Sequence, residues 1–490
     1  MSEKRPEPSR NLPHITIIHP DLGIGGAERL IIDVALALQN TGHKVSVYTS
    51  HCDKSHCFEE ARDGTLDVNV RGDRYLPPNL GGRFVVLFAI LRQVVLTGQL
   101  LREFAARGSD GEEDVDEVFI VDQVPACVPI LKVFGDWALG RGKGKSRQRI
   151  LFYCHFPDQL LARRDEGGLT LLAGLKGLYR YPFDAFEGWA ISAADRVVAN
   201  SQFTRGVVQS VFGGGRLGDV KVVYPCVDTE VEGQDREREN KVKEGKVWAG
   251  KKILLSVNRF ERKKDLALAI RAYHGLGEGR RGVRLVVAGG YDPRITENVQ
   301  YHAELETLTS SLGLQHATSK TVPSALSIPD SIDVLFLPSV SSAFRDTLLS
   351  QSSLLLYTPV NEHFGIVPIE AMRAGIPVLA SNTGGPLETI LEGETGWLRD
   401  ATDVPAWTAV MDKVLYQLSE AERKKISVAA KERVERLFSL RAMGETLESE
   451  IGDMLGKERR AFSGGQQVLT MLLGLLGLVL GAVLVGVLYK

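Results

Sequence analysis

The chain has 490 residues, of which 44% are hydrophobic and 24% are charged, and this is enough apolar sequence for the cores of two globular domains. Its formal net charge of −2 excludes the strongly basic class of nucleic-acid-binding proteins. The five cysteines are too few and too irregularly spaced for a disulfide framework, and residues 1–13 lack the apolar core of a secretory signal. We therefore expect a globular protein of a reducing compartment.

Short apolar runs alternate with helical stretches in the first half of the chain, as in the βα units of a parallel sheet. These strand candidates are residues 14–20, 44–50, 117–122, 149–157, 196–201 and 221–225. They predict a Rossmann-like domain over residues 13–229. Residues 230–252 are highly charged and have no apolar periodicity, which predicts a linker.

The alternation starts again after the linker and predicts a second Rossmann-like domain over residues 253–457. Its strand candidates are residues 252–260, 283–290, 332–339, 353–359 and 376–382. A charged, alanine-rich helical stretch, residues 403–457, closes this domain. The predicted fold class is therefore α/β, with two parallel-sheet domains in succession.

A glycine-rich loop, DLGIGGAER, follows the first strand candidate. Gly23, Gly25 and Gly26 form a tight turn there, at the edge where open α/β sheets bind ligands. The spacing is not G-x-G-x-x-G, so ordinary turn chemistry explains these glycines as well as a bound ligand does.

Two further segments of the first half allow more than one interpretation. Residues 51–57, HCDKSHC, contain two histidines and two cysteines, but their spacing does not match a zinc site and we expect no metal there. Residues 84–101 are nearly continuous apolar sequence interrupted by Arg92 and Gln93. They form either a core helix or a helix in the membrane interface, with the arginine at the polar boundary.

His155 stands at the carboxyl end of the strand candidate 149–157, within YCHFPD. A histidine in that position faces the crevice in which parallel sheets bind ligands, where it can bond a sugar hydroxyl or polarise a reacting centre. A structural histidine is the alternative, and Asp158 is a lesser candidate.

Arg259 and Lys264 lie five residues apart, between the strand candidate 252–260 and the next helix. Two fixed cations in this position would stabilise a departing diphosphate. Arg262 and Lys263 lie beside them, so a solvated basic loop is the alternative.

The segment 361–386, NEHFGIVPIEAMRAGIPVLASNTGGP, carries the strongest functional signal. Glu362 and Glu370 are eight positions apart on either side of a turn at Gly365. A helix N-terminus after a strand attracts anions, and a carboxylate within the helix can bind a pair of hydroxyls, as in dinucleotide-binding folds. The segment predicts a nucleotide-sugar site, and an ordinary βα unit with solvated glutamates is the alternative.

Residues 468–489 contain no charge and are followed by Lys490. A helix of this length rises about 33 Å at about 1.5 Å per residue, which is enough to cross a hydrocarbon core of about 30 Å. Lys457, Arg459 and Arg460 precede it, which favours the cytosolic side for the rest of the chain. We predict a transmembrane helix at residues 468–489.

Together these motifs resemble the retaining glycosyltransferases of family four, whose GT-B architecture has two Rossmann-like domains facing a central cleft. The resemblance covers about residues 14–450 and rests on GGAER at 25–29, on Arg259 with Lys264, and on the E-x7-E element from Glu362 to Glu370. YCHFPD, FEGWAISAADRVVANSQFT, VNRFERKKDLALAI and AGGYD are similar to the α-1,3/1,6-mannosyltransferases that act on dolichol-linked oligosaccharides.

The resemblance implies a role for each matching residue. Glu370 would bind the donor ribose, and Glu362 would contact hydroxyls of the transferred mannose, with His155 near the same sugar. The other implied contacts are the backbone of Phe364, Gly365 and Ile366 at the diphosphate and sugar, Arg259 and Lys264 at the leaving GDP, and Gly25 and Gly26 near the reacting centre. Retention implies front-side attack, in which the departing phosphate oxygen helps to take the proton of the acceptor.

The same resemblance implies GDP-mannose as the donor and mannosyl-chitobiosyl-diphosphodolichol as the acceptor, an early step towards protein N-glycosylation. It implies no cofactor and no metal, because the two cations would take the place of a metal at the diphosphate. The catalytic domains would lie on the cytosolic face of the endoplasmic reticulum membrane, with other early-pathway mannosyltransferases as candidate partners. Two alternatives stay open, namely the same donor with another lipid acceptor, and an inert tail-anchored scaffold for other transferases.

Overall fold

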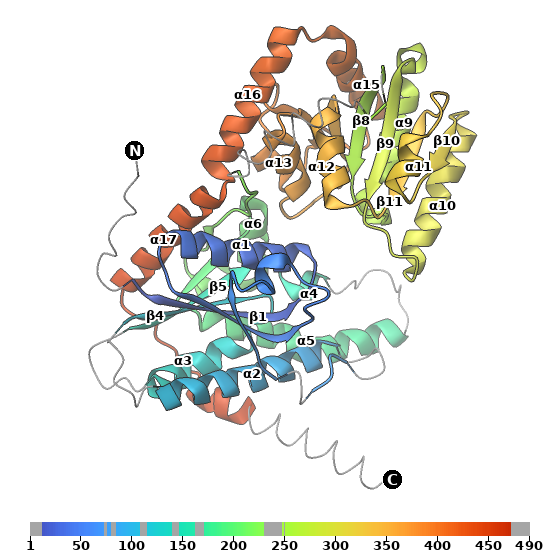
Figure 1. Cartoon of the computed structure of the whole chain (residues 1–490). Helices are drawn as coiled ribbons and strands as arrows, with labels where there is room; N and C mark the ends of the chain where they lie inside the picture. Colours follow the sequence, from blue (N-terminus) through green and yellow to red (C-terminus); the bar gives the residue numbers. More distant parts are fainter. Residues whose placement is uncertain are drawn as a thin grey trace, which may run out of the picture. The chain divides into compact units, whose positions relative to one another are not determined.

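The computed structural model describes residues 12–72, 76–79, 85–107, 115–139, 147–161, 171–229, 247–248 and 250–471. The chain forms two compact units, each with its own parallel β-sheet (Figure 1). Unit 1 contains Met1–Tyr224 and Met443–Lys490, and unit 2 contains Pro225–Ala442. The predicted pair of Rossmann-like domains is confirmed, whereas the predicted linker at 230–252 lies mostly outside the described residues.

In the described part of unit 1, seven parallel strands follow the order β3-β2-β1-β4-β5-β6-β7. The strands are β1 (His14–Leu22), β2 (Val45–Cys52), β3 (Asp67–Val70), β4 (Glu117–Asp122), β5 (Gln148–Cys154), β6 (Arg196–Ala199) and β7 (Lys221–Val222). Every residue of β4 and β5 is buried, as expected for central strands with helices on both faces. The sequence analysis missed β3, because this edge strand is half polar.

Helices cover both faces of this sheet. They are α1 (Gly26–Asn40), α2 (Val85–Arg107), α3 (Cys127–Ala138), α4 (Asp158–Leu161), α5 (Leu171–Ser192), α6 (Gln202–Phe212), α7 (Gly214–Leu217) and α17 (Leu440–Gly456), with a short 3-10 helix, η1, at Glu59–Ala61. Figure 1 shows α1 and α17 along one face and α2, α3 and α5 along the other. Leu96 and Leu100 of α2, Val128 of α3 and Phe152 of β5 belong to the core between them.

Helix α2 is the apolar segment predicted at residues 84–101. Its Arg92 is 6% exposed and lies 2.8 Å from the Asp21 carboxylate. The Gln93 side chain accepts a hydrogen bond from the Cys127 N–H at 3.0 Å and donates one to the Val124 carbonyl at 2.5 Å. Both polar residues therefore point into unit 1 and not towards a membrane boundary. Among the described helices, Val85–Ala106 is nevertheless long and apolar enough to span a membrane, and 44% of its most apolar 18-residue stretch is buried.

In the described part of unit 2, seven parallel strands follow the order β10-β11-β9-β8-β12-β13-β14. The strands are β8 (Lys252–Val257), β9 (Val283–Gly289), β10 (His316–Thr318), β11 (Val334–Pro338), β12 (Leu354–Tyr357), β13 (Val378–Ser381) and β14 (Gly396–Arg399). The edge strands β10 and β14 were not predicted, because they are three and four residues long and carry no sustained apolar run.

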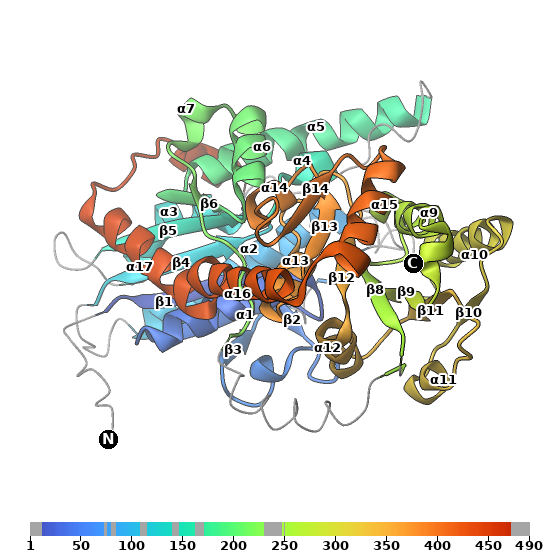
Figure 2. The ribbon, with the colours of Figure 1, turned by 90° about the horizontal axis from the view of Figure 1, so that it is seen from above.

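The helices of unit 2 also lie on both sides of their sheet. They are α9 (Leu266–Gly275), α10 (Thr296–Ser311), α11 (Val322–Leu326), α12 (Ser342–Gln351), α13 (Ile366–Arg373), α14 (Pro386–Thr389), α15 (Val404–Asp412) and α16 (Glu420–Leu437), with shorter turns at η3 (Arg262–Lys264), η4 (Gly277–Arg280) and η5 (Lys413–Gln417). Figure 2 shows α9 and α10 on one side of β8, β9 and β11, and α11 and α12 on the other. Trp407 and Phe336 are fully buried in this core.

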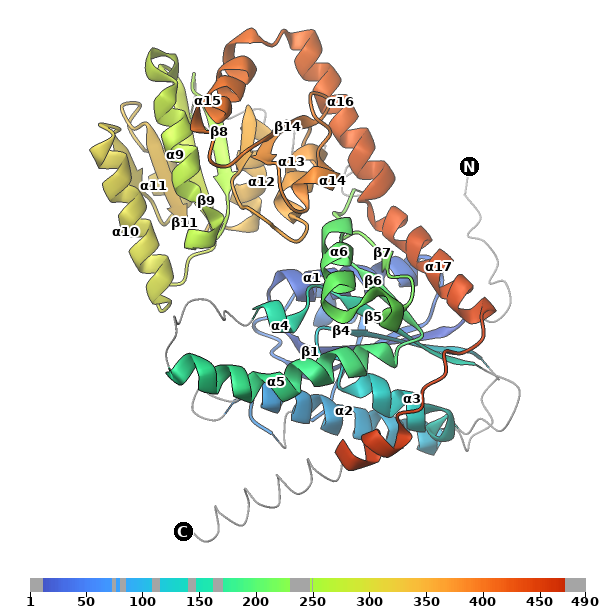
Figure 3. The same cartoon turned by 180° about the vertical axis from the view of Figure 1, so that it is seen from behind.

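After α16 the chain returns to unit 1 through α17. Helix α17 packs against α1 so closely that a Cβ at Gly444 would lie 3.2 Å from the Ala37 carbonyl oxygen. Glu448 of α17 contacts the His43 imidazole and accepts a hydrogen bond from Thr41 at 3.1 Å. Figure 3 follows the chain from α17 past α3 to a short helix at residues 465–471. The predicted second domain extended to residue 457, whereas the residues from Met443 onwards belong to unit 1.

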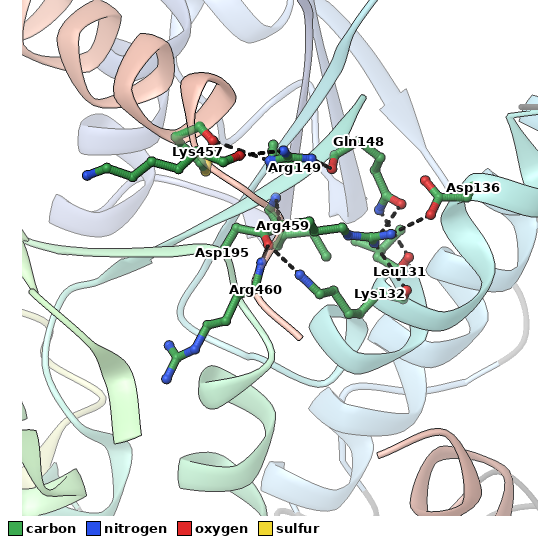
Figure 4. Close-up of polar contacts among 11 residues, drawn as sticks. Leu131, Lys132, Asp136, Gln148, Arg149, Asp195, Lys457, Arg459 and Arg460 are labelled. Atoms are coloured by element: carbon green, nitrogen blue, oxygen red, sulfur yellow. Dashed lines mark hydrogen bonds and ion pairs between the residues drawn. The ribbon is translucent and has the colours of Figure 1, made fainter. Parts of the chain in front are cut away.

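Polar groups of β5 and α3 hold the residues that follow α17 (Figure 4). Arg149 donates a hydrogen bond to the Lys457 carbonyl at 2.8 Å, and Arg459 donates one to the backbone of α3 at 3.1 Å. The Arg460 N–H donates to the Asp195 carboxylate at 3.1 Å. The residues that suggested a membrane orientation therefore also attach this segment to unit 1, Arg459 through its side chain and Lys457 and Arg460 through their backbone.

The structure describes the first part of the predicted transmembrane helix at 468–489. Val468 is fully buried in the unit 1 core, Met471 packs against the same core, and Leu469 is 55% exposed. Residues 472–489 lie outside the described residues, so the membrane span itself stays a prediction.

Candidate active site

In both sheets the strand order reverses, between β1 and β4 in unit 1 and between β8 and β12 in unit 2. Open α/β sheets bind ligands at such switch points, outside the carboxyl ends of the strands. The predicted site residues follow strands at or beside these points: Gly25 and Gly26 after β1, His155 after β5, Arg259 and Lys264 after β8, and Glu362, Phe364, Gly365, Ile366 and Glu370 after β12.

Lys264 lies directly against Glu362. The Lys264 carbonyl accepts a hydrogen bond from Thr358 Oγ1 at 2.6 Å, which ties the loop after β8 to the loop after β12. The Lys264 ammonium forms an ion pair with the Glu362 carboxylate, and these side chains are 14% and 24% exposed. The fold thus brings together two predicted site residues that are far apart in sequence.

Two glycines let the loop between β12 and α13 adopt its shape. Gly365 has φ of +89°, and a Cβ there would lie 3.1 Å from the Tyr357 ring. The Gly385 N–H donates to the Glu362 carbonyl at 2.7 Å, and a Cβ at Gly385 would lie 2.2 Å from the Phe364 carbonyl oxygen. These contacts hold the loop after β12 against the loop after β13. The loop after β12 ends at Gly365, the N-cap of α13, and the first N–H groups of a helix have no intrahelical acceptor and attract anions.

Glu370 lies in the fifth position of α13 and is 14% exposed. Burial raises the pKa of Glu370 above its usual range, and Arg345 of α12, at 3.2 Å, opposes that shift in part. One carboxylate oxygen, Oε2, is buried and has no hydrogen-bond partner among the residues that the structure describes. Such an atom costs stability unless a ligand bonds it. The sequence analysis missed Arg345, because nothing near it in sequence marks its pairing with Glu370.

Arg259 lies apart from this pair of glutamates. Its side chain is 64% exposed and its ion-pair partner in the structure is Glu261, at 3.6 Å. A cation that is so exposed and so loosely paired can move towards an anion at the carboxyl edge of β8. Of the other predicted contacts, the Phe364 side chain is 4% exposed and Ile366 is 36% exposed.

In unit 1 the structure joins His155 to two residues that were not predicted. The His155 Nε2 lies 2.9 Å from an oxygen of the Asp122 carboxylate, at the end of β4. On its other side the Asp122 carboxylate lies 2.8 and 2.9 Å from the His19 Nδ1 of β1. His19 and Asp122 are buried, whereas the His155 side chain is 18% exposed. Apolar strand sequence surrounds His19 and Asp122, so no local pattern predicts that they meet.

The predicted glycines of unit 1 stand at the start of α1. Gly25 is the N-cap residue, and Gly26 is the first helical residue. A Cβ at Gly25 would lie 2.2 Å from the Glu28 carboxylate, whereas a Cβ at Gly26 would have no atom within 4 Å. The described part of unit 1 therefore leaves room for a side chain at Gly26.

A metal site was not expected from the sequence. Within the described ranges, no group of three or more His, Cys, Asp or Glu side chains could hold a metal ion. Lys264 pairs with Glu362 and Arg345 pairs with Glu370, whereas the exposed Arg259 pairs with Glu261. Metal-independent binding of a diphosphate stays a prediction.

Comparison with protein families and solved structures identifies the fold. The family described as "Glycosyltransferase Family 4" matches residues 24–231, and "Glycosyl transferases group 1" matches residues 237–433. A glycosyltransferase from Rickettsia africae has a TM-score of 0.61 at 18% identity, covering 91% of this chain and 99% of that one. The catalytic domain of starch synthase IV from Arabidopsis thaliana has a TM-score of 0.63 at 14% identity, covering 91% and 100%. These neighbours support the predicted GT-B fold.

Relatives of much higher identity cover both units. An alpha-1,3/1,6-mannosyltransferase of Neurospora crassa is 47% identical over 455 residues, which are 92% of this chain and 92% of that protein. The alpha-1,3/1,6-mannosyltransferase of Saccharomyces cerevisiae is 43% identical over 469 residues, 91% of this chain and 86% of that protein. The predicted enzyme class is confirmed. The chain belongs to the alpha-1,3/1,6-mannosyltransferase family of glycosyltransferases.

Proposed function

We propose that this mannosyltransferase takes mannose from GDP-mannose and adds α-1,3- and α-1,6-linked mannoses to mannosyl-chitobiosyl-diphosphodolichol. One observation carries the donor site: Glu370 holds a buried carboxylate oxygen without a hydrogen-bond partner among the described residues, at the switch point of unit 2. A ribose hydroxyl would satisfy that oxygen, as an acidic residue does in dinucleotide-binding folds. The acceptor is inferred from the paired linkages in the names of the relatives.

Lys264, Arg259 and Glu362 of unit 2 contact the other parts of the donor, the diphosphate and the mannose. The Lys264 ammonium moves from Glu362 to the diphosphate, and the exposed Arg259 joins it there. Glu362, released from its ion pair, accepts hydrogen bonds from hydroxyls of the mannose. The N–H groups at the start of α13, beside Gly365, face the same anion. Charge-assisted bonds of this kind strengthen as negative charge develops on the leaving GDP, and they supply the stabilisation without a metal.

The bond between mannose and GDP breaks while the acceptor hydroxyl attacks from the same face, so that the configuration is retained. The departing phosphate oxygen receives the hydroxyl proton, and the two cations stabilise the remaining charge. In unit 1, His155 forms a hydrogen bond with a hydroxyl of the reacting sugar. Gly25 and Gly26, which have no side chains, let the backbone lie close to the substrate. Neither Glu362 nor Glu370 is required as a general acid or base.

We further propose that residues 468–489 form a single membrane span in the endoplasmic reticulum, with both units on the cytosolic side. The span is apolar on every face and contains no charge. A lipid-linked acceptor requires the enzyme to work at a membrane surface. The first described residues of this segment, Val468 and Met471, pack with unit 1, to which we assign the acceptor.

The proposal is tested with membranes that contain the full chain, incubated with radiolabelled GDP-mannose and one lipid acceptor at a time. We expect transfer to mannosyl-chitobiosyl-diphosphodolichol, two successive products, and an unchanged rate in the presence of EDTA. Transfer to a phosphatidylinositol glycan instead would replace the acceptor, and loss of activity with EDTA would overturn metal independence. If Glu370→Gln left the KM for GDP-mannose unchanged, the ribose site would be wrong.

A further inference from the structure

Three neighbouring strands of unit 1 each contribute one side chain to a buried cluster. His19 lies in β1, Asp122 ends β4, and His155 follows β5. These strands are adjacent in the sheet order, and the gap between β1 and β4 is its switch point. The cluster therefore lies where unit 1 would present groups to a ligand, although two of its three members are shielded from solvent.

The carboxylate determines where the protons of the histidines lie. An ionised carboxylate accepts hydrogen bonds and donates none, so each imidazole nitrogen that faces it must carry a proton. His155 is therefore protonated on Nε2, at 2.9 Å from Asp122. No described residue bonds its other nitrogen, Nδ1, which has a lone pair when the ring is neutral. A sugar hydroxyl can donate a hydrogen bond to that lone pair.

His19 explains how a carboxylate can stay ionised in this position. Burial by itself raises the pKa of Asp122, but the charge of His19 and the hydrogen bonds from both histidines lower it below its usual range. Burial by itself lowers the pKa of His19, but Asp122, with smaller effects of Glu28 and the Asp21 backbone, raises it. A buried carboxylate needs a partner of opposite charge, and a protonated His19 supplies that charge. His19 then balances the charge of Asp122, and His155 is held through its hydrogen bond to the same carboxylate.

We propose that Asp122 and His19 are positioning residues for His155, and that they fix its ring orientation and its Nε2 proton so that Nδ1 accepts a hydrogen bond from a hydroxyl of the reacting sugar. The inference rests on the role given to His155 in the proposed function. It adds two residues to the site that neither touch the substrate nor appear in any sequence motif. It also states which nitrogen of His155 meets the sugar.

A double-mutant cycle on kcat tests whether Asp122 acts through His155. Asp122→Asn replaces one accepting oxygen by an N–H₂ group, so one imidazole N–H meets another donor and the ring of His155 loses its fixed position. We expect Asp122→Asn and His155→Gln each to lower kcat by about 10- to 100-fold, with little change in the KM for GDP-mannose. The double variant should be no slower than His155→Gln, because the positioning residue has nothing left to position.

Glu117→Gln is the matched control. Glu117 lies at the other end of β4, is 5% exposed, and accepts a hydrogen bond from Thr16 at 2.6 Å. Neutralising this buried carboxylate perturbs the same strand to a similar degree, and we expect kcat to stay unchanged. An equal loss of kcat in Glu117→Gln would mean that the effect of Asp122→Asn is structural, and would overturn the proposal.

A second measurement keeps the proposal testable if Asp122→Asn does not fold. The full chain in detergent micelles, labelled with isotopic nitrogen in its 10 histidines, gives ring-nitrogen NMR signals, and His155→Gln identifies those of His155. We expect a neutral ring with the proton on Nε2. A proton on Nδ1, or additive losses of kcat in the cycle, would overturn the inference. Full activity of His155→Gln would instead remove the role of His155 in the proposed function.

Discussion

At the switch point of unit 2 the charged groups are ion pairs that solvent can still reach, whereas at the switch point of unit 1 the pair of His19 and Asp122 is buried inside the sheet. Lys264 and Glu362 are 14% and 24% exposed, and Arg345 and Glu370 are 32% and 14% exposed. Partly exposed pairs of this kind can exchange one partner for a ligand without burying an unpaired charge. Unit 2 therefore has the groups expected of a site that takes up and releases a diphosphate.

The cluster of unit 1 has no such freedom. His19 and Asp122 are 1% and 0% exposed, so separating them would leave a buried charge without a partner. His155 is the one member of the cluster that reaches solvent, at 18% exposure. The difference between the units agrees with the proposed roles, in which unit 2 exchanges charges with the donor and unit 1 holds His155 in a fixed position.

The largest effect is expected from Lys264→Ala. This change removes the cation assigned to the leaving diphosphate and leaves Glu362 without its ion-pair partner, so we expect kcat to fall by about 10²- to 10³-fold. Lys263→Ala is the control, because the adjacent lysine is 62% exposed and pairs with Glu261 at 3.1 Å. Transfer of labelled mannose in membranes measures both, with circular dichroism to show folding. Full activity of Lys264→Ala would break the comparison, since unit 2 would then exchange no charge with the donor.

A smaller effect is expected from Glu370→Gln. This change should weaken the binding of GDP-mannose but make the folded protein more stable. The ribose contact weakens, so the KM for GDP-mannose should rise by about 10-fold or more. The pKa of Glu370 is higher in the folded state than in the unfolded state, so ionisation of this carboxyl opposes folding. The resulting loss of stability begins as the pH rises through the pKa of the unfolded state. We therefore expect the variant to melt about 2–4 °C higher at neutral pH and with less gain in acid.

Scanning calorimetry and donor titration measure the two effects of Glu370→Gln. Glu388→Gln, in α14 of the same unit, is the control for a general effect of removing one carboxylate. An unchanged KM with lower stability would show that Glu370 is a structural partner of Arg345. In that case unit 2 would resemble unit 1, and the contrast between them would disappear.

The parts of this molecule that could be predicted from its sequence are those with a local pattern. The inner strands of both sheets are short apolar runs, and the Glu362–Gly365–Glu370 spacing places a loop and a helix N-terminus within one segment. The missing residues are partners that only the fold brings together. Asp122 lies 103 positions from His19 and 33 from His155, and their contact depends on strand order, which a single sequence does not specify.

The return of the C-terminal segment to unit 1 was missed for a related reason. Helix α17 has an ordinary helical pattern, and a pattern shows that one face is buried without showing which sheet buries it. The contacts that decide this join distant positions, such as Arg149 with the Lys457 carbonyl. The charges of Lys457, Arg459 and Arg460 had a sufficient local explanation in membrane orientation, so their contacts with unit 1 were not considered.

The smallest effect is expected from His19→Asn, and it sharpens the comparison through pH. The folded-state pKa of His19 is raised, so its stabilising effect is present below the unfolded value of 6.5 and is lost as the pH rises through the folded value. The folded-state pKa of Asp122 is lowered, so the stabilising effect of its ionised carboxylate is present above the unfolded-state pKa of 3.8 and is lost in stronger acid. Asparagine retains an N–H donor but not the charge.

The loss of stability in His19→Asn should therefore be larger at about pH 6 than in alkali, where the charge of His19 is lost from the unchanged protein as well. Hydrogen exchange of the β4 amides, compared with the unchanged protein at each pH, measures this difference locally. His56→Asn, at an exposed histidine of the same unit, should show none. Glu370 has the opposite behaviour, because its penalty appears as the pH rises. A loss in His19→Asn that did not vary with pH would mean that His19 is uncharged, and unit 1 would then hold Asp122 ionised by hydrogen bonds alone.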